Sequence, residues 1–532
     1  ILDRYGVWDT RAIAAHCVWT TEDDWAGMAE KGVACVHNPV SNLKLGSGEA
    51  WIPAMKAAGV PIALGTDGVS SNNNQDMFEE MKFAAVLHNG VTRDPLALLP
   101  QDVLAMATRE GAKALGRKTG RGAIGAYKIL SRKFKWLGWL GVLSAFLILG
   151  FYCALGGYCL KYVPLNVGNL FHAGFGTGTL DGAGVFDALM ANQGECVIYG
   201  LLFVAITMII VMGGVGGGIE KVCSVGMPAL FVMLVICIIR SCTLEGASEG
   251  LKYMFVPGWA LANGVIKEAP NFFSVVSTAG GQMFFSLSLG MAAMITYGSY
   301  LDKKENLQKN AIIIVVMDTL VALMAGLCVI PGRFALDPTG TLGGPSLLFV
   351  TMQNVFDRMG SVGPIFGIMF YLLVVFAAIS SSISLLEAVV AHYVDRARDR
   401  GKGDKRKPYS VLAGIAAGIL CVIVCLDSLG SAGISPADIL GMRGTMEKLP
   451  TWSADWLDFF DCIAEGILMP LGALLMSIMY GWEIGPEVVH AEATREGQSF
   501  GAYGWFKICI KYITPLCMLL VLYGQIKEFF FT

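Results

Sequence analysis

Charged side chains are scarce in this sequence: Asp, Glu, Lys and Arg together make up 15% of its 532 residues. Apolar residues reach 55% and the mean hydropathy is +0.58, both above what an ordinary soluble protein contains. A membrane protein is therefore the first expectation. The net charge is only −3 and the basic residues are not pooled in one region, which excludes a nucleic-acid partner.

The cysteine pattern of a metal or disulfide scaffold is also absent. The 14 cysteines are scattered, many inside apolar runs such as CVIVC at 421–425, and none form a CxxC pair. The sequence begins at Ile1 without an initiator Met, a basic n-region or the apolar stretch of a signal peptide. We therefore expect a fragment.

The pattern of apolar residues changes near Arg117. Before this residue, short apolar strands alternate with charged, amphipathic helices, as in a soluble α/β protein. Three successive βα units are predicted, with strands at IAAHCVW, VACVHNP and PIALGTDG and helices near 21–31, near 48–58 and onward to Arg117. Three such units are too few to close a barrel.

After Trp136 the sequence consists of long apolar runs separated by polar segments. A helix needs about 20 residues to cross the roughly 30 Å hydrocarbon core of a bilayer. We predict a mostly α-helical polytopic membrane protein with nine spans, preceded by a partial βα-barrel fragment, with domains at 1–116, 117–135 and 136–532. The spans lie near 136–162, 196–214, 222–243, 275–300, 310–331, 364–394, 409–427, 457–481 and 504–528.

Lysine and arginine collect in three segments of the membrane part. These clusters precede the first span, follow the fourth and follow the sixth, so even numbers of spans separate them and all three share one face. By the positive-inside rule this face is cytoplasmic, and the stretch 165–195, which has no Lys or Arg, lies outside. The clusters are Arg117, Lys118, Arg121, Lys128, Arg132, Lys133 and Lys135; Lys303, Lys304 and Lys309; and Arg396, Arg398, Arg400, Lys402, Lys405, Arg406 and Lys407.

Four carboxylates lie inside predicted spans, at Asp318, Glu387, Asp458 and Glu465. An ionisable group in a span is costly and usually faces a cavity or a partner, which makes these residues functional candidates. The alternative is a hydrogen-bonded structural carboxylate near a helix end. This alternative applies most to Asp458, which lies close to the start of its span, and less to Asp318 and Glu387, which lie deeper.

The predicted fourth span, 275–300, is interrupted by small residues. This composition suits a broken helix, whose unwound carbonyls and half-helix ends can hold ions and substrate where they line a cavity. Small residues also serve close helix packing, which is the alternative. The small residues are Gly280, Gly281, Ser286, Ser288 and Gly290.

The predicted sixth span carries a small polar cluster. Ala377, Ser380, Ser381 and Ser382 supply carbonyl and hydroxyl oxygens, hard donors of the kind that Na⁺ prefers. The alternative is that each serine only bonds a backbone carbonyl one turn back along the helix.

Four long motifs resemble one known family. They are GRKTGRGAIGAYK, GQMFFSLSLGMAAMITYGSYL, VVMDTLVALMAGL and FAAISSSISLLEAVVAHYVDR. In this order they are similar to the bacterial branch of the neurotransmitter:sodium symporter family, over residues 115–532. The nine spans would be the family's helices three to eleven, and the fourth span its unwound sixth helix. The resemblance implies a sodium-coupled symporter of amino acids or related small molecules, in the bacterial cytoplasmic membrane with residues 1–135 in the cytoplasm.

The resemblance also implies roles for residues at a substrate site. Tyr152 would touch the substrate carboxylate, and Phe285 would form an aromatic lid over the site. Ser286 and Ser288 would contact substrate from the unwound segment. Met291 would line the subpocket for the substrate side chain, so a fairly large apolar or aromatic substrate is expected.

Two ion sites and two gates follow from the same resemblance. Ser286 and Asp318 would lie beside the first co-transported Na⁺. Asp395 would form the inner gate and Asp458 the outer gate. The residues that match the second Na⁺ site are Ala377, Ser380 and Ser381.

The first two helices of that family are missing from the sequence. In the family the first helix supplies half of both sodium sites, main-chain contacts to the substrate carboxylate, and the arginine that pairs with each gate aspartate. An ion site with half of its ligands loses most of its affinity, and Asp318 is then expected to be protonated rather than to remain an uncompensated buried charge. The rocking of one repeat against the other is incomplete as well. We therefore predict a truncated symporter without coupled transport.

The first 116 residues resemble a second family. AAHCVW, HNPVSNLKLGSG and LGTDGVSSNNNQDMFEEMK are similar to the amidohydrolase branch that deaminates methylthioadenosine, S-adenosylhomocysteine and related compounds. By this resemblance Asp67 would ligate the metal, Zn²⁺ in the intact parent, and handle the proton of the attacking water, which His16 would orient. His37 is expected to be structural and His88 to be solvated on a helix face. The HxH pair and the HxxE segment that complete the family's metal site are absent, so both catalytic residues are expected to be vestigial.

The two resemblances meet in ALGR at 114–117, a helix ending that suits both families. A genuine fusion would be expected to keep each domain whole and to join them by a polar linker. We therefore interpret the sequence as two reading frames joined at this point. Three hypotheses remain open: a symporter fragment, a metal-dependent hydrolase with a membrane anchor, and a hybrid without activity.

Overall fold

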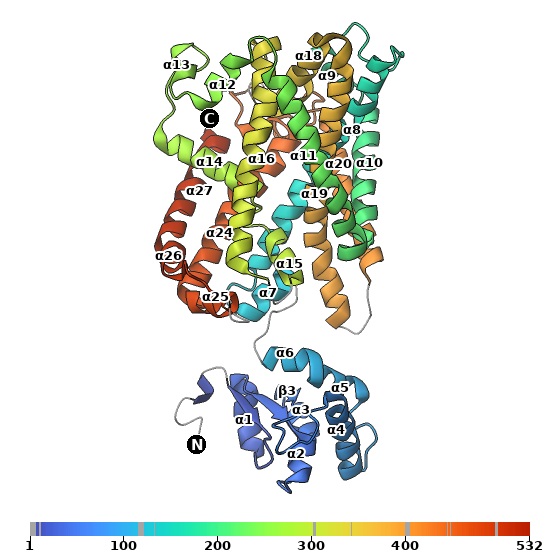
Figure 1. Ribbon diagram of the computed structural model, residues 1–532, viewed down its shortest axis with the longest axis vertical. Coiled ribbons are helices and arrows are strands. Elements are labelled where there is room, and N and C mark those ends of the chain that lie inside the picture. The colour runs from blue at the N-terminus through green and yellow to red at the C-terminus, as the bar shows by residue number, and fades with distance from the viewer. Residues whose placement is uncertain are drawn as a thin grey trace. The chain divides into compact units, whose positions relative to one another are not determined.

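The chain divides into two compact units, Ile1–Thr119 and Gly120–Thr532, in a computed structural model (Figure 1). The described residues are 7–9, 12–114, 122–131, 133–301, 305–341, 343–399, 405–443, 445–446, 448–494 and 498–531. Most of the proposed junction at 114–117 lies outside them. Of the three basic clusters, the residues that also lie outside the described ranges are Arg117, Lys118, Arg121, Arg132, Lys303, Lys304, Arg400 and Lys402.

The first unit is built on a three-stranded parallel sheet with the order β1-β2-β3. Strand β1 (Ile13–Ala15) pairs with β2 (Ala34–His37), and β2 pairs with β3 (Ile62–Leu64). Parallel neighbours need a crossover connection, which α1 (Glu22–Lys31) supplies between β1 and β2. This helix lies where the sequence predicts, because the Thr21 side chain caps its first turn.

The second crossover differs from the single helix predicted near 48–58. It consists of α2 (Pro39–Lys44) and α3 (Ile52–Ala57). Gly48 has a φ of +108°, outside the right-handed helical region, so no helix can run through it. The prediction was therefore wrong at the N-terminal end of α3, and it missed α2.

Four helical segments follow β3 and cover the sheet. They are α4 (Met77–Thr92), α5 (Pro100–Ala105), the π-helical turn η3 (Met106–Glu110) and α6 (Gly111–Ala114). Together with the sheet they enclose an apolar core of their own, and the buried members of this core include Met28, Cys35, Ile52, Met55 and Leu98.

Eight helices in the described part of the second unit are long and apolar enough to cross a membrane. Six are α8 (Leu137–Leu170), α10 (Gln193–Met212), α11 (Glu220–Cys242, preceded by the turn η4, Val215–Ile219), α16 (Leu307–Leu336), α19 (Gly363–Asp399) and α20 (Arg406–Asp427). Two combine α-helices with π-helical turns: α23 (Trp456–Asp461), η7 (Cys462–Leu468), α24 (Met469–Ile478) and η8 (Met479–Glu483), then α26 (Tyr503–Ile508), η10 (Cys509–Ile513) and α27 (Thr514–Phe531). Shorter helices connect them, among them α7 (Ala123–Leu130), α9 (Gly182–Ala191), α12 (Ala247–Phe255), α18 (Met352–Arg358) and α25 (Pro486–Ala493).

The predicted fourth span, 275–300, is interrupted, as its composition indicated. Helix α14 (Phe272–Ser286) and helix α15 (Ala292–Tyr300) are separated by a non-helical segment. Within this segment Ser288 and Gly290 have φ values of +54° and +76°, which a right-handed helix excludes. Neither half is long enough to cross a bilayer alone.

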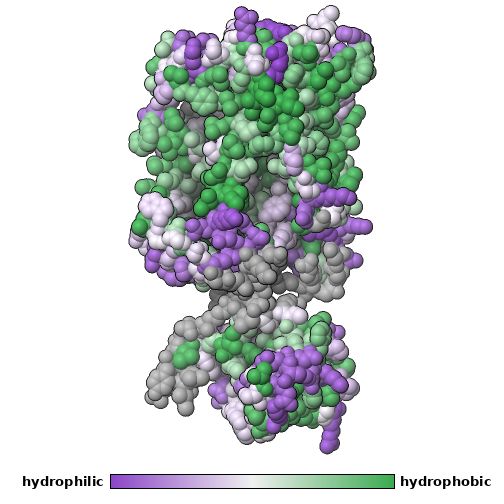
Figure 2. Space-filling view, viewed as in Figure 1, coloured by the Kyte–Doolittle hydropathy of each residue, from purple (hydrophilic) through white to green (hydrophobic). Residues whose placement is uncertain are grey.

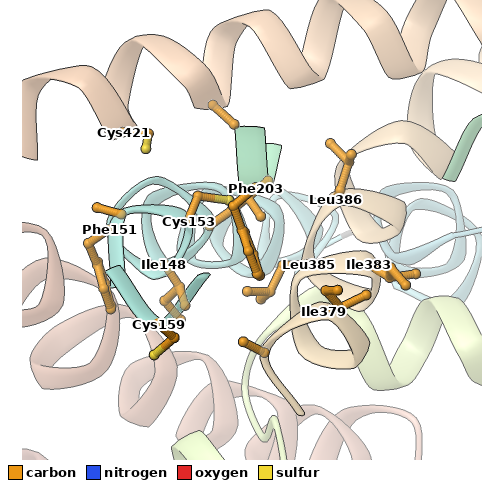
Figure 3. Close-up of a cluster of buried hydrophobic side chains, with 14 of the residues drawn as sticks. Ile148, Phe151, Cys153, Cys159, Phe203, Ile379, Ile383, Leu385, Leu386 and Cys421 are labelled. Carbon is orange, nitrogen blue, oxygen red and sulfur yellow. The ribbon is translucent and has the colours of Figure 1, made fainter. Parts of the chain in front are cut away.

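Helix α8 is the most buried of the eight long helices, and it packs against α10, α19 and α20. Glycines allow the close approach, because a Cβ on Gly157 would lie only 2.6 Å from the Cα of Gly200 in α10. The ring of Phe203 from α10 fills the space beside Gly156 of α8. Figure 3 shows Phe203 among apolar side chains of the cluster that surrounds it.

Helices α11, α16 and the helix Tyr503–Phe531 form the most exposed part of the bundle. Only 17%, 6% and 11% of their most apolar windows are buried inside the unit. The exposed side chains of α16 are apolar, for example Ile312, Val316 and Leu320. Figure 2 shows hydrophobic residues across the middle of this unit and hydrophilic residues toward its ends. Such a surface is stable against lipid or further apolar helices rather than against water.

Candidate functional site

The break between α14 and α15 gathers the residues predicted to bind substrate. Phe285 and Ser286 end α14, Ser288 lies in the break, and Met291 directly precedes α15. Tyr152 reaches this segment from α8, and its ring centroid lies 6.4 Å from that of Phe285. Two half-buried aromatic rings and a buried methionine thus border the unwound backbone.

Glycine packing holds this break in place. Gly290 lies directly against the backbone of Met469 at the start of α24, where an added Cβ would be 2.1 Å from the Met469 carbonyl oxygen. In return, a Cβ on Gly472 of α24 would lie 2.7 Å from the Gly290 carbonyl oxygen. The positive φ of Gly290 and this backbone contact both require glycine.

The residues predicted for the first sodium site lie together. The Ser286 hydroxyl donates a hydrogen bond to Oδ1 of Asp318 in α16. Ser286 is exposed and Asp318 is partly exposed. A hydroxyl and a carboxylate therefore lie next to one another beside the break, on a partly exposed surface.

The serines of α19 divide between two faces of the helix. Ser380 donates to the Ala377 carbonyl at 2.8 Å, and Ser381 is exposed on the side of the helix that is near the Tyr152 side chain. Ser382 points the other way, into the bundle, where its hydroxyl lies 2.8 Å from that of Thr207. Ser382 is thus a packing residue, whereas Ser381 lies beside the candidate substrate site.

The two predicted gate residues lie at helix ends. Oδ2 of Asp395 accepts a hydrogen bond of 2.7 Å from the Gly122 amide, the N-cap of α7. A carboxylate at a helix N-terminus is stabilised by the helix dipole. Asp458 lies in the first turn of α23, where its amide donates to Oδ1 of Asp455 at 2.7 Å.

The remaining two intramembrane carboxylates have partners. Glu387 is fully buried and accepts hydrogen bonds of 2.5 Å from Arg406 of α20 and from the Tyr300 hydroxyl of α15. It therefore ties three helices together, which is the structural alternative for this residue. Glu465 lies one turn after Asp461, and the two side chains interact electrostatically.

In the first unit, Asp67 and His16 lie near one another, as predicted. His16 Nε2 is 3.8 Å from Asp67 Oδ2, and both residues have positive φ angles, of +66° and +61°. The hydroxyls of Ser41 and Ser71 donate to Asp67 Oδ2 at 2.6 and 2.7 Å, and these bonds lower the pKa of Asp67 to about 2. Asn42 holds His16 through a 2.8 Å contact to Nδ1.

These serine and asparagine partners were not singled out from the sequence. Ser41 and Asn42 belong to the HNPVSN motif, and Ser71 belongs to the segment TDGVSS. All three residues were therefore part of the motifs that indicated the amidohydrolase resemblance. Only the fold shows that the three side chains converge on His16 and Asp67.

The prediction that His88 is solvated was wrong. His88 is 2% exposed, and its Nε2 lies 3.1 Å from Nε2 of His37, which ends β2. Burial lowers the pKa of His37 to about 3 and that of His88 to about 4, so both rings are neutral at pH 7. The face of α4 that carries His88 is turned toward the sheet, which helical periodicity alone does not determine.

A zinc site does not fit the residues of this unit. In the described part of the chain, no group of three or more His, Cys, Asp or Glu side chains is placed to hold a metal ion. Catalytic zinc needs about three protein ligands and a water. Asp67 and His16 alone fall short of this number.

Comparisons with known proteins agree with both parts. The model of the amidohydrolase family matches residues 1–128, and that of the sodium:neurotransmitter symporter family matches residues 188–531. A 5'-deoxyadenosine deaminase of Methanosarcina mazei is 52% identical over 23% of the chain, but this region spans only 28% of the deaminase.

The membrane unit has relatives over most of their length. An uncharacterised sodium-dependent transporter of Bacillus subtilis is 32% identical, over 77% of the chain and 84% of that transporter. The crystal structure of MhsT in complex with L-phenylalanine matches with a TM-score of 0.63 and 32% identity, over 76% of the chain and 85% of MhsT. The chain, with its amidohydrolase-family segment at the N-terminal end, therefore belongs to the sodium:neurotransmitter symporter family.

Proposed function

We propose that the membrane unit is the substrate- and ion-binding part of a sodium-coupled amino-acid symporter from which two helices are missing. The observation that carries this proposal is the break between α14 and α15, bordered by Tyr152, Asp318 and Ser381 from three other helices. Unwound backbone at membrane depth is tolerated only where it is buried in protein or lines a cavity, where it can hold ions and substrate.

The expected substrate is a large apolar or aromatic amino acid. Tyr152, Phe285 and Met291 provide apolar surface beside the break, while its backbone amides and carbonyls suit an α-carboxylate and an ammonium group. MhsT was crystallised with L-phenylalanine, which supports the same class of substrate.

The chain by itself is proposed not to couple sodium to transport. Ser286 and Asp318 are the candidate side-chain ligands of the first sodium ion, and the surface of α16 around them is exposed. A cation held by half a shell of oxygens remains mostly hydrated, so neither ion nor substrate gains enough binding free energy to drive a conformational change.

Uptake by a hybrid tests this proposal. The first two helices of the Bacillus subtilis relative would replace residues 1–121, directly before Gly122. We expect Na⁺-dependent uptake of L-phenylalanine by vesicles with the hybrid and none by vesicles with the original chain. Asp318→Ala in the hybrid should abolish the uptake, whereas Asp187→Ala on the exposed face of α9 should not. Equal uptake by the original chain, or a hybrid insensitive to Asp318→Ala, would contradict the proposal.

We infer a bacterial inner-membrane location, with residues 1–135 and the three basic clusters in the cytoplasm. The domain boundaries proposed are 1–116, 117–135 and 136–532. A protease added to inverted membrane vesicles should degrade the first unit, while one added to intact spheroplasts should not.

Deamination is a second candidate function, favoured by the contact between His16 and Asp67. We expect it to be absent, because the metal ligands of this unit are incomplete. The purified chain, supplied with Zn²⁺ and 5'-deoxyadenosine, should release no ammonia. Release of ammonia that Asp67→Asn abolishes would revive this candidate.

A further inference from the structure

A small cavity with sulfur-rich walls lies between α11, α16, α18 and α19, apart from the candidate substrate site. Its lining includes Cys237 of α11, Cys328 of α16, and Met352 and Met359 from the α18 region. The space admits little more than one water-sized sphere, which is too small for an organic ligand but sufficient for one ion.

The two cysteines of this cavity come from two packed helices, Cys237 from α11 and Cys328 from α16. Cys237 and Cys328 are 6% and 3% exposed, and both side chains line the cavity. Helices α11 and α16 pack closely here, since Gly332 of α16 lets the Ser241 hydroxyl approach to 3.0 Å of where a Cβ would be. The sulfur pair is therefore held by two packed helices rather than by a loop.

Two further groups make the cavity more than an apolar gap. Ser241 lines it, and its hydroxyl is buried without a hydrogen-bond partner in the described part of the chain. Arg240 also lines it and places a positive charge at its wall. A buried polar atom without a partner is unusual in a packed core, so the Ser241 hydroxyl is free to contact a ligand in the cavity.

We propose that Cys237 and Cys328 bind one Cu⁺ ion as thiolates, with a thioether of Met352 or Met359 completing the site. Thiolate and thioether sulfur are soft donors, which select Cu⁺ over Na⁺, Mg²⁺ or Ca²⁺. On binding, both thiols release their protons to water and two S–Cu bonds form, so no electron is transferred. The bis-thiolate complex carries one negative charge, which Arg240 compensates.

Zinc suits this cavity less well. Structural zinc takes four thiolate or imidazole ligands in a tetrahedron, and only two thiolates are available at the cavity. Two thiolates with a neutral thioether match the low coordination number and soft character of Cu⁺ instead.

Competition for Cu⁺ tests the proposal on the full chain in detergent. The purified protein would be titrated against Cu⁺ bound to bicinchoninate under ascorbate, and its tight sites counted. We expect the variant Cys237→Ser/Cys328→Ser to bind one equivalent fewer than the wild type. Met352→Leu and Met359→Leu keep the thiols, and at least one of them should weaken the site tenfold or more.

A matched control is a second pair of buried thiols, Cys421 and Cys425 of α20, whose sulfurs lie 4.0 Å apart on one helix. Because neither residue of this pair lines the cavity between α11 and α16, Cys421→Ser/Cys425→Ser should retain the tight equivalent. Equal Cu⁺ stoichiometry in the wild type and in Cys237→Ser/Cys328→Ser would overturn the proposal. So would wild-type affinity in both methionine variants.

Discussion

Glu387 shows at the scale of one residue how a buried charge is tolerated in the bundle. Its carboxylate is fully buried and is bonded by Arg406 and Tyr300, so neither oxygen is left without a donor. The sequence placed Glu387 in a span and Arg406 in a basic cluster, but it gave no reason to pair them, because 19 residues separate them.

Removal of this carboxylate is expected to destabilise the membrane unit strongly. Glu387→Gln removes the charged carboxylate bound by the largely buried Arg406 guanidinium, and breaking such a buried pair typically costs about 3–5 kcal/mol. The double variant Glu387→Gln/Arg406→Gln should recover part of this loss. Thermal unfolding in detergent would measure both.

The exposed pair Glu249–Lys252 in α12 provides the control for this prediction. Glu249→Gln should change stability by about 0–1 kcal/mol, because water screens an exposed pair. If the two glutamine substitutions lowered the stability equally, the burial of Glu387 would not be the cause of the loss.

The histidine pair of the first unit predicts a pH-dependent stability. Burial lowers the pKa of His37 to about 3 and of His88 to about 4, against 6.5 in an unfolded chain. The unfolded chain therefore binds protons that the folded unit does not, so stability is full above pH 6.5 and falls as the pH drops toward 4. Pulse proteolysis in urea at pH 7 and pH 5 should show this loss.

His88→Gln removes one of the two titrating groups and should reduce the difference between pH 7 and pH 5. His172→Gln is the matched control, because His172 is an exposed histidine of the other unit. A pH dependence that His88→Gln leaves unchanged would mean that other groups of the first unit cause it.

At the scale of elements, glycine decides where helices can meet. Gly157 of α8 faces the backbone of α10, and a methyl group there would lie 2.6 Å from the Gly200 Cα. Gly157→Ala must therefore push two helices apart, which typically costs about 1–3 kcal/mol. We expect a lower melting temperature of the membrane unit in detergent.

Gly298→Ala in α15 is the control for this effect. No atom lies within 4 Å of where its Cβ would be, so the added methyl group only favours the helical conformation. An unchanged or slightly higher melting temperature is expected. If Gly298→Ala lowered it as much as Gly157→Ala, the loss would not come from the contact between α8 and α10.

The elements also show where sequence patterns suffice. The small residues of 275–300 predicted the break between α14 and α15, because Gly and Ser permit the positive φ angles that end a helix there. The helix predicted near 48–58 was too long, because apolar spacing does not reveal that Gly48 has a positive φ.

At the scale of the whole molecule, two incomplete families share one chain. The deaminase relative is covered over 28% of its length and the transporter relative over 84%. A polymerase chain reaction on source DNA, with primers at the codons of Asp67 and Phe285, tests our interpretation that two reading frames are joined. We expect no product across both sites, while each half amplifies beside the rest of its own family's sequence. A spanning product would establish a genuine fusion.

The sequence by itself determined the membrane class, the number and approximate position of the long helices, and the two families. These follow from apolar run length and from motif order, which are local properties of the chain. Only the tertiary structure decided which partners other polar groups have, such as Glu387 with Arg406 and His88 with His37. Such pairs join residues far apart in sequence, and which face of a helix turns inward depends on the packing of every neighbour.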